Sequence, residues 1–360
     1  MDPIFVTKTF IPPHQEVFDH MKRAMEKNWL TNRGMLVKEL ENQISKFLQL
    51  EDTKMFCTNN GTIPLQLAIR ELGEEGEVIT TPFSYVATVS SIIWEHCTPV
   101  FVDIHPEYLT IDETKIEDAI TEKTTCILAT HVFGNPCKVE EINRIANKYN
   151  LKVIYDAAHC FGVEYKGKSI FEFGDVSTCS FHSTKIFHTA EGGAVFCKDE
   201  KLIKKLFSRH NFGHNGYLEI DELGINGKMS ELHAAMGLAV LPYVKSNIEE
   251  RKQLVEYYKT NLANSKLTFL KIRENTVWNY SYFPVIFESE EKLLSVIAKF
   301  EQNQIYARRY FYPSLNKLKF IPKTSHLLSE DIAERILCLP LYFGLSNIDK
   351  ERILNILKEY

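Results

Sequence analysis

Residues 125–159 read TCILATHVFGNPCKVEEINRIANKYNLKVIYDAAH and contain two apolar runs separated by an amphipathic segment. The apolar runs, 125–134 and 151–159, have the length and composition of buried strands. The segment between them, 139–150, repeats apolar residues at helical spacing with polar residues between them. A strand, a helix and a second strand in this order are typical of an α/β fold with a mostly parallel sheet.

The same alternation continues on both sides of this stretch. Further strand-like runs occur at 77–81, 99–104, 177–182 and 192–197. We therefore expect one large α/β domain over 21–244, preceded by an N-terminal arm over 1–20. After Pro242 the pattern changes to a long helical segment, two strand-like segments and another helix, which predicts a smaller α+β domain over 245–360.

The composition is that of an ordinary globular protein. The 360 residues are 25% charged and 44% apolar, with a net charge of −5. No long run of lysine or arginine occurs, which argues against a nucleic-acid partner. No apolar stretch is long enough to cross a membrane, and the first residues lack the pattern of a signal peptide. Eight cysteines without a C-x-x-C pair indicate reduced thiols, so we expect a cytoplasmic protein.

Polar residues follow several predicted strands, at the edge where open α/β sheets bind ligands. In 55–73 a short apolar run leads through Asn60 and Gly61 into a helix that starts near Thr62. The free backbone amides at a helix start form an anion site, so Gly61 and Thr62 are candidates to bind a phosphate. The alternative is ordinary capping of the helix by Asn60.

A carboxylate stands at the end of another predicted strand. Asp156 follows a hydrophobic run directly, and a buried carboxylate is costly unless it is paired. It could face a cationic ring nitrogen, or it could cap a helix. His159 and Cys160 follow, but no matching ligand spacing occurs elsewhere, so we expect no metal site.

Residues 177–197, STCSFHSTKIFHTAEGGAVFC, place Lys185 between two apolar runs, with Ser180 five residues before it. Taken alone, such a lysine is most often a solvated loop residue. Tyr85 follows the predicted strand 77–81, where an aromatic ring can stack on a flat ligand or pack in the core.

Together these residues match the needs of pyridoxal 5′-phosphate. Its phosphate binds amides and hydroxyls, its pyridinium nitrogen pairs with an acid, and its aldehyde bonds a lysine. Lys185 would be that lysine, with a pKa below the ordinary value of about 10.4 so that the amine reacts near neutral pH. The alternative is a lyase that uses Lys185 without a cofactor, but such an enzyme needs neither the phosphate site nor Asp156.

The chain resembles the DegT/DnrJ/StrS family of nucleotide-sugar aminotransferases over nearly its whole length. The resemblance rests on NWLTNRG (28–34), NNGTIPLQLAI (59–69), TTPFSYVATVSSI (80–92), THVFGNP (130–136), YDAAHCFG (155–162), SFHSTKIFHTAEGGAVF (180–196), GINGKMSELHAAMGLAVL (224–241), RRYFYPSL (308–315) and CLPLYFGL (338–345). It implies the aspartate-aminotransferase fold, fold type I, with a large α/β domain and a smaller C-terminal domain.

The resemblance also implies roles at the cofactor ring. Lys185 occupies the position of the Schiff-base lysine, and Asp156 that of the partner of the pyridinium nitrogen. His159 occupies a place near the ring and its 3-hydroxyl, and Tyr85 that of the stacking aromatic. Some family members with histidine in place of the lysine are dehydratases, so Lys185 favours transamination.

Further positions match the phosphate site of the family. Gly61, Thr62 and Ser180 match contacts within one subunit, and Asn226 matches a residue that reaches the phosphate from the neighbouring subunit. This match implies a homodimer with shared active sites. Lys228 stands where many relatives have arginine, and it keeps the charge without the bidentate fork.

The implied reaction transfers the amino group of L-glutamate to a nucleotide-linked keto sugar. Residues 307–318 resemble relatives that aminate C4 of dTDP-4-dehydro-6-deoxy-D-glucose for O-antigen or other surface glycans. The candidate substrate contacts are Thr31, Asn32, Arg33, Lys228, Arg308, Arg309 and Tyr310. Alternatives are 3-amination, a UDP-sugar substrate, or a non-catalytic regulator that senses a ligand.

Overall fold

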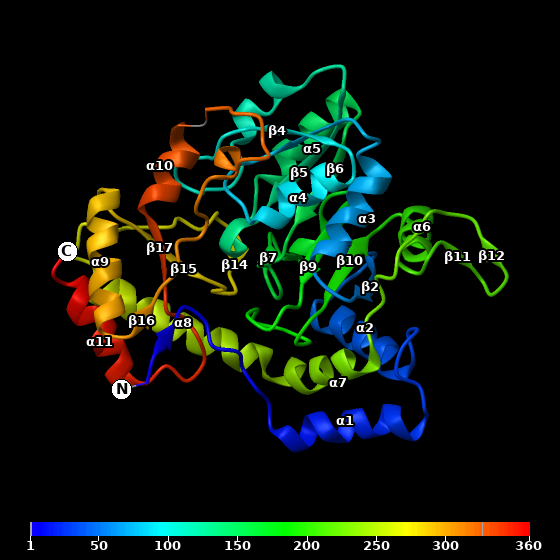
Figure 1. The fold of residues 1–360 in the computed structure, drawn as a ribbon, viewed down its shortest axis with the longest axis horizontal. Coiled ribbons are helices and arrows are strands. Elements are labelled where there is room, and N and C mark those ends of the chain that lie inside the picture. The colour runs from blue at the N-terminus through cyan, green and yellow to red at the C-terminus, as the bar shows by residue number, and fades with distance from the viewer. Residues whose placement is uncertain (1, 326) are drawn as a thin grey trace.

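The computed structural model describes residues 2–325 and 327–360. At its centre is a seven-stranded sheet with the order β2-β10-β9-β6-β5-β3-β4 (Figure 1). The strands are β2 (Lys54–Thr58), β3 (Glu77–Thr80), β4 (Thr98–Phe101), β5 (Thr124–Thr130), β6 (Lys152–Asp156), β9 (Val176–Ser180) and β10 (Gly193–Cys197). In this sheet β10 runs antiparallel to β2 and β9, and the other pairs are parallel. The mostly parallel sheet expected from the sequence is confirmed.

Helices cover both faces of this sheet. Those on one face are α3 (Thr62–Leu72), α4 (Val86–Trp94) and α6 (Glu200–His210). Those on the other face are α2 (Met35–Phe47), α5 (Val139–Tyr149) and α7 (Glu231–Val240). Side chains alternate along β6, so Val153 and Tyr155 pack toward the second group and Ile154 toward the first. This double burial explains why the strands read as continuous apolar runs.

The residues after α7 build a second core. Helix α8 (Val244–Asn261) leads to an antiparallel sheet of β13 (Thr268–Phe269), β15 (Phe283–Ile286) and β17 (Ile336–Leu339). Helices α9 (Glu290–Gln302) and α11 (Asn347–Leu357) pack in the same apolar core. Because α8 starts at Val244 and contacts both cores, we propose to keep the domain division into 21–244 and 245–360.

The short elements lie at the margins of these layers. They are β7 (Glu164–Tyr165), β8 (Lys168–Ser169), β11 (His214–Asn215), β12 (Glu219–Ile220), β14 (Thr276–Val277) and α10 (Leu327–Arg335). The hairpin of β11 and β12 projects beyond α6 at the right of Figure 1. Among the residues that the structure describes, no helix combines the length and the apolar composition needed to cross a membrane.

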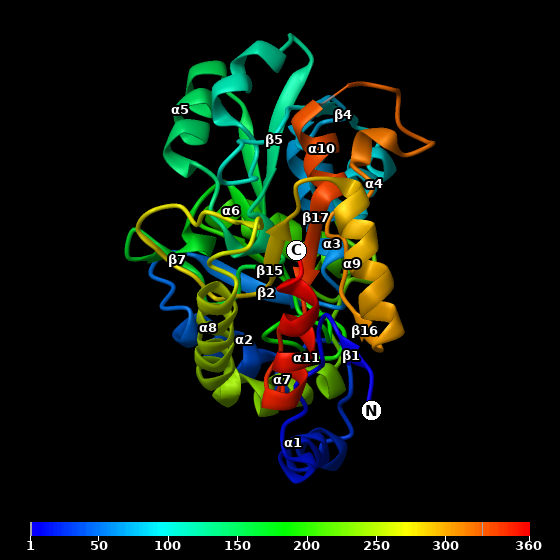
Figure 2. The ribbon, with the colours of Figure 1, turned by 90° about the vertical axis from the view of Figure 1, so that its left-hand side faces the viewer.

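The N-terminal segment differs from the expected arm. Helix α1 (His14–Glu26) follows Pro13, whose restricted φ favours a helix start, and it packs along α7. Strand β1 (Ile4–Phe5) pairs in parallel with β16 (Ile305–Tyr306), as Figure 2 shows, and Ile4 is buried in the C-terminal core. Residues 2–20 therefore contribute a strand and the first turns of a helix.

Several predicted strands are shorter than their apolar runs; the run 151–159, for example, is a strand only over Lys152–Asp156. The run 99–104 continues as strand only to Phe101, and the run 125–134 only to Thr130. Beyond Thr130 the chain turns sharply, with Phe133 at a φ of 58°. These turns follow the carboxyl ends of the strands, where the candidate site residues lie.

Candidate active site

Several strand ends meet at the carboxyl edge of the central sheet. Strand β2 leads to Gly61, β3 leads to Tyr85, β6 ends at Asp156, and the loop from β9 to β10 carries Lys185. These residues line one cavity with a volume of about 240 Å³. Its lining consists of Asn60, Gly61, Thr62, Leu65, Tyr85, Ala87, Asp156, Ala158, His159, Ser180, His182, Thr184, Lys185, Glu191, Arg308, Tyr310 and Phe311.

Lys185 presents an amine to this cavity. Its backbone N–H donates to the carbonyl of His182 at 2.9 Å, and its Nζ lies 5.7 Å from the centre of the Tyr282 ring. Burial of the amine lowers the pKa of Lys185, and Tyr310 and Asp156 offset part of this effect. A lowered pKa makes more of the amine neutral, and therefore nucleophilic, near pH 7.

Asp156 is a buried carboxylate with only 5% of its surface exposed. Its Oδ1 accepts a hydrogen bond from the Ala158 N–H at 3.1 Å, and its Oδ2 accepts one from the Thr88 hydroxyl at 3.0 Å. Burial raises the pKa of Asp156, and these two bonds and the charge of Lys185 offset part of the rise. No helix starts after Asp156, so the helix-capping alternative does not apply.

His159 offers a hydrogen-bond donor without a charge. Its Nδ1 accepts a hydrogen bond from the Phe133 N–H at 3.2 Å, so the neutral ring carries its proton on Nε2. Burial lowers the pKa of His159 well below its ordinary value, and Lys185 acts in the same direction. The ring stacks on Phe311 with centroids 5.9 Å apart.

The start of α3 packs closely against Ser180. A side chain at Gly61 would place its Cβ 2.6 Å from the Ser180 Cβ, so glycine is needed for this approach. Asn60 Oδ1 accepts hydrogen bonds from the amides of Thr62 and Ile63, both at 2.9 Å. The expectation of a free Thr62 amide is corrected, because Asn60 caps the helix. The Gly61 N–H and the hydroxyls of Thr62 and Ser180 remain as donors, and this cradle fits a phosphate.

Other predicted residues gather elsewhere in the same chain. Asn32, Arg33 and Lys228 line a separate cavity of about 570 Å³. Lys228 Nζ donates to Asn226 Oδ1 at 2.8 Å, which adds Asn226 to this group. The Arg33 guanidinium is held by Glu41 at 2.7 Å. Within one chain this group does not line the lysine cavity.

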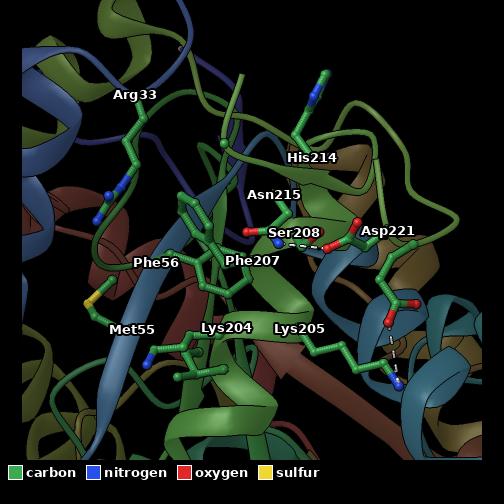
Figure 3. Close-up of a pocket in the computed structure, with 13 residues that line it drawn as sticks. Arg33, Met55, Phe56, Lys204, Lys205, Phe207, Ser208, His214, Asn215 and Asp221 are labelled. Carbon is green, nitrogen blue, oxygen red and sulfur yellow. Dashed lines mark hydrogen bonds and ion pairs between the residues drawn. The ribbon is translucent and has the colours of Figure 1, made fainter. Parts of the chain in front are cut away.

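A cavity of about 630 Å³ lies between α6 and the β11–β12 hairpin (Figure 3). In Figure 3 Arg33 stands at one side and Lys204 and Lys205 rise from α6. Lys205 already pairs with Glu71 at 2.6 Å, and Arg33 is paired as described above. The lining of this cavity does not bring a buried lysine and a buried aspartate together, as Lys185 and Asp156 are in the lysine cavity. The chemistry therefore favours the lysine cavity as the active site, although it is the smaller of the two.

Two neighbouring arginines have different surroundings. Arg308 lines the lysine cavity, and its guanidinium lies 4.3 Å from the centre of the Tyr310 ring. Arg309 Nη2 instead donates to Glu290 Oε1 at 2.6 Å, because successive side chains of an extended segment point to opposite sides. Arg309 is therefore left out of the proposed site. Thr31 is exposed and lines neither cavity.

Several residues of the lysine cavity were not among the predicted site residues, and the polar or aromatic ones are His182, Thr184, Glu191 and Phe311. His182 Nε2 and Glu191 Oε1 lie 3.7 Å apart across the loop that carries Lys185. All four lie inside segments that carry the family resemblance, and this resemblance was the one feature of the sequence that could have identified them as site residues. Local spacing does not predict how this loop folds back, so the pair could not be found from the pattern alone.

Fold and site together define a class, an α/β enzyme with a cavity suited to pyridoxal 5′-phosphate. Residues 13–358 match the DegT/DnrJ/EryC1/StrS aminotransferase family, and the chain belongs to this family. It is a pyridoxal-phosphate-dependent sugar aminotransferase.

Named relatives cover almost the whole chain. The chain is 40% identical to a dTDP-4-amino-4,6-dideoxy-D-glucose transaminase of Shigella dysenteriae, over 99% of each sequence. It is 37% identical to a transaminase of the same name from Escherichia coli, over 98% of this chain and 96% of that one. It is 32% identical to a GDP-perosamine synthase of Escherichia coli O157:H7, over 91% of each.

Solved structures share the fold. DesI, determined in the presence of its TDP-sugar product, has a TM-score of 0.93 and 28% identity, over 100% of this chain and 93% of that one. The sugar aminotransferase Spr1654 of Streptococcus pneumoniae in its PLP form has a TM-score of 0.91 and 26% identity, over 99% and 98%. The expected fold type I is confirmed.

Proposed function

We propose that this enzyme transfers the amino group of L-glutamate to C4 of dTDP-4-dehydro-6-deoxy-D-glucose and forms dTDP-4-amino-4,6-dideoxy-D-glucose. The observation that carries the proposal is the 40% identity, over 99% of both chains, to a transaminase named for this product. The convergence of Lys185, Asp156 and the Gly61 cradle in one cavity supports it independently.

When bound, pyridoxal 5′-phosphate supplies the electron sink that stabilises a carbanion next to nitrogen. With the cofactor bound, Lys185 would hold its aldehyde end, and the Lys185 amine would be the group that carries a proton to and from the carbon that loses or gains the amino group. Asp156, which lines the cavity, would favour a protonated ring nitrogen. His159 would donate from Nε2 to an oxygen of the ring, and Tyr85 would offer an aromatic surface for stacking.

The remaining residues bind and orient. The Gly61 amide and the hydroxyls of Thr62 and Ser180 bind the cofactor phosphate. Arg308 has no carboxylate partner among the described residues, so with Tyr310 it can bind an anionic group of the nucleotide sugar.

The test of this function is a half-reaction followed by absorbance. The protein loaded with pyridoxal phosphate should absorb near 410–430 nm, and L-glutamate should move the band toward about 330 nm. Adding dTDP-4-dehydro-6-deoxy-D-glucose should restore the first band and yield a 4-amino sugar by NMR. A cofactor-loaded protein that L-glutamate leaves unchanged would contradict the proposed donor.

Amination at C3 is the second candidate function. The chain is 29% identical to a dTDP-3-amino-3,6-dideoxy-α-D-galactopyranose transaminase of Aneurinibacillus thermoaerophilus, less than to the relatives named for C4. UDP-linked and GDP-linked 4-keto sugars and a 3-keto dTDP-sugar belong in the same assay. A faster return of the visible band with any of these would replace the proposed substrate.

We also propose a homodimer in which Asn226 and Lys228 of one subunit complete the site of the other. Within one chain these two residues lie outside the lysine cavity. The hairpin beside them exposes Tyr217 and Leu218 almost fully, at 99% and 96%, which is unusual unless a partner covers them.

Complementation between inactive variants tests the shared site. Lys185→Ala should be inactive, and Asn226→Asp should be nearly so, because a carboxylate there would repel the cofactor phosphate. In a co-expressed heterodimer one site carries both changes and the other carries neither, so purified heterodimers should recover about half of the wild-type activity per dimer. Recovery would be absent if each chain built its own site.

The cellular setting is part of the proposal. All eight cysteines are free thiols in the structure, which suits a reducing compartment such as the cytoplasm. We propose that the amino sugar enters O-antigen or another surface glycan of the lipopolysaccharide type. The discriminating observation is loss of a 4-amino-4,6-dideoxy sugar from isolated glycans when the gene is deleted.

A further inference from the structure

Three buried hydroxyl groups are linked in series to Asp156 Oδ2. We propose that Thr88, Ser84 and Thr130 form a one-directional hydroxyl chain that keeps the Asp156 carboxylate ionised and aimed at the cofactor ring. They act as positioning residues through Asp156. The inference deepens the proposed function, because it rests on the cofactor role of Asp156.

The chain is continuous and shielded from water. Thr88 Oγ1 lies 3.0 Å from Asp156 Oδ2, Ser84 Oγ lies 2.8 Å from Thr88 Oγ1, and Thr130 Oγ1 lies 3.0 Å from Ser84 Oγ. The exposed fractions of Thr88, Ser84 and Thr130 are 0%, 2% and 5%. Thr88 lies in α4, Ser84 in the turn that leads into α4, and Thr130 at the end of β5, so two segments far apart in the sequence converge on one carboxylate.

The direction of the hydroxyl chain follows from counting protons. An ionised Asp156 can only accept hydrogen bonds, so Thr88 must donate its single hydroxyl proton to that carboxylate. Thr88 can then only accept from Ser84, and Ser84 can then only accept from Thr130. All three O–H dipoles therefore point toward Asp156, and each bond polarises the next in a site of low dielectric. A protonated Asp156 would lose this alignment.

The hydroxyl chain counters the effect of burial. Burial raises the pKa of Asp156, and the Thr88 bond acts in the opposite direction. The other titratable groups around Asp156 are Lys185, His159 and three cysteines, and Lys185 is the one that lowers its pKa. The cysteines are Cys137, Cys160 and Cys179, whose thiols have raised pKa values and stay neutral.

The test replaces single hydroxyls in the full-length protein and uses pyridoxal phosphate as the probe. Thr88→Val should weaken pyridoxal phosphate binding about tenfold or more, the usual scale for a hydrogen bond to a charged group. It should also raise the pH midpoint of the visible band by about one unit or more. A less ionised Asp156 leaves the cofactor ring without its positive charge, and the Lys185 nitrogen then holds its proton more tightly because a repelling charge is gone. Ser84→Ala should act in the same direction, by about threefold in affinity, because it acts only through Thr88.

Matched variants separate this role from simple packing. Thr80→Val is the control, since Thr80 on β3 is fully buried and its hydroxyl has no partner in the described part of the chain. It should change neither the affinity nor the midpoint. Thr88→Ser keeps the hydroxyl and should restore both, which decides the matter even if Thr88→Val folds poorly.

The double variant Thr88→Val/Ser84→Ala is the sharpest comparison. It should match Thr88→Val alone in pH midpoint, because Ser84 cannot act once Thr88 is gone. If the shifts in pH midpoint of the two single variants add in the double variant, the proposed hydroxyl chain is wrong. It is also wrong if the single variants behave like Thr80→Val. Wild-type protein that binds no pyridoxal phosphate would instead overturn the proposed function, so the two failures are distinguishable.

Discussion

Replacing Lys185 by arginine is expected to abolish transamination, with a loss on the order of 10⁴-fold or more in the half-reaction with L-glutamate. Arginine keeps the positive charge and most of the length but stays protonated at every accessible pH. It can neither bond the aldehyde carbon nor carry a proton between carbons. The measurement is the rate of band conversion in single-turnover absorbance.

The control for this change is Lys201→Arg on the exposed first turn of α6, which should leave the rate unchanged. An independent readout traps the cofactor on the wild-type protein with borohydride and locates it by peptide mass analysis. The label should appear on the peptide containing Lys185 and be absent from Lys185→Arg. A label on any other lysine would contradict the assignment.

The fold was predictable because burial on both faces leaves a strong local signal. Strands such as β5 and β6 are nearly continuous apolar runs, and the α5 segment between them has helical spacing. The N-terminal helix α1 was missed because its packing along α7 involves residues more than 200 positions away. No local pattern reports such a contact, and the same applies to the pairing of β1 with β16.

The candidate site was predictable to a different degree. Residues at strand ends, such as Asp156, are placed by the sheet itself, so sequence position largely determines where they lie. Loop and turn residues depend on details that spacing does not encode. Asn60 takes the Thr62 amide, and Arg309 faces Glu290 while Arg308 faces the cavity. Asn226 and Lys228 illustrate a second limit of spacing, because a sequence alone does not say which subunit's cavity a residue lines.

Asp156→Asn is expected to give the second large loss, about 10²- to 10³-fold in the half-reaction, with the cofactor still bound. The amide has nearly the same shape, and its single oxygen can still accept from the Ala158 N–H while its NH2 group donates to the Thr88 hydroxyl, so the fold should survive. It has no negative charge to hold a proton on the ring nitrogen, so the electron sink weakens. Binding of pyridoxal phosphate should weaken in parallel, because a charged pair is replaced by a neutral contact.

The matched control is Asp175→Asn, at the start of β9 and the opposite end of the sheet from the cavity. Asp175 also accepts from a backbone amide, that of Val153 at 2.8 Å, so its replacement reports the structural cost of such a change. Thermal unfolding of the cofactor-free proteins should fall no more for Asp156→Asn than for Asp175→Asn, because burial already disfavours the Asp156 charge. A rate for Asp156→Asn close to that of Asp175→Asn would mean that the ring nitrogen needs no charged partner here, and the hydroxyl chain linked to Asp156 would then be purely structural.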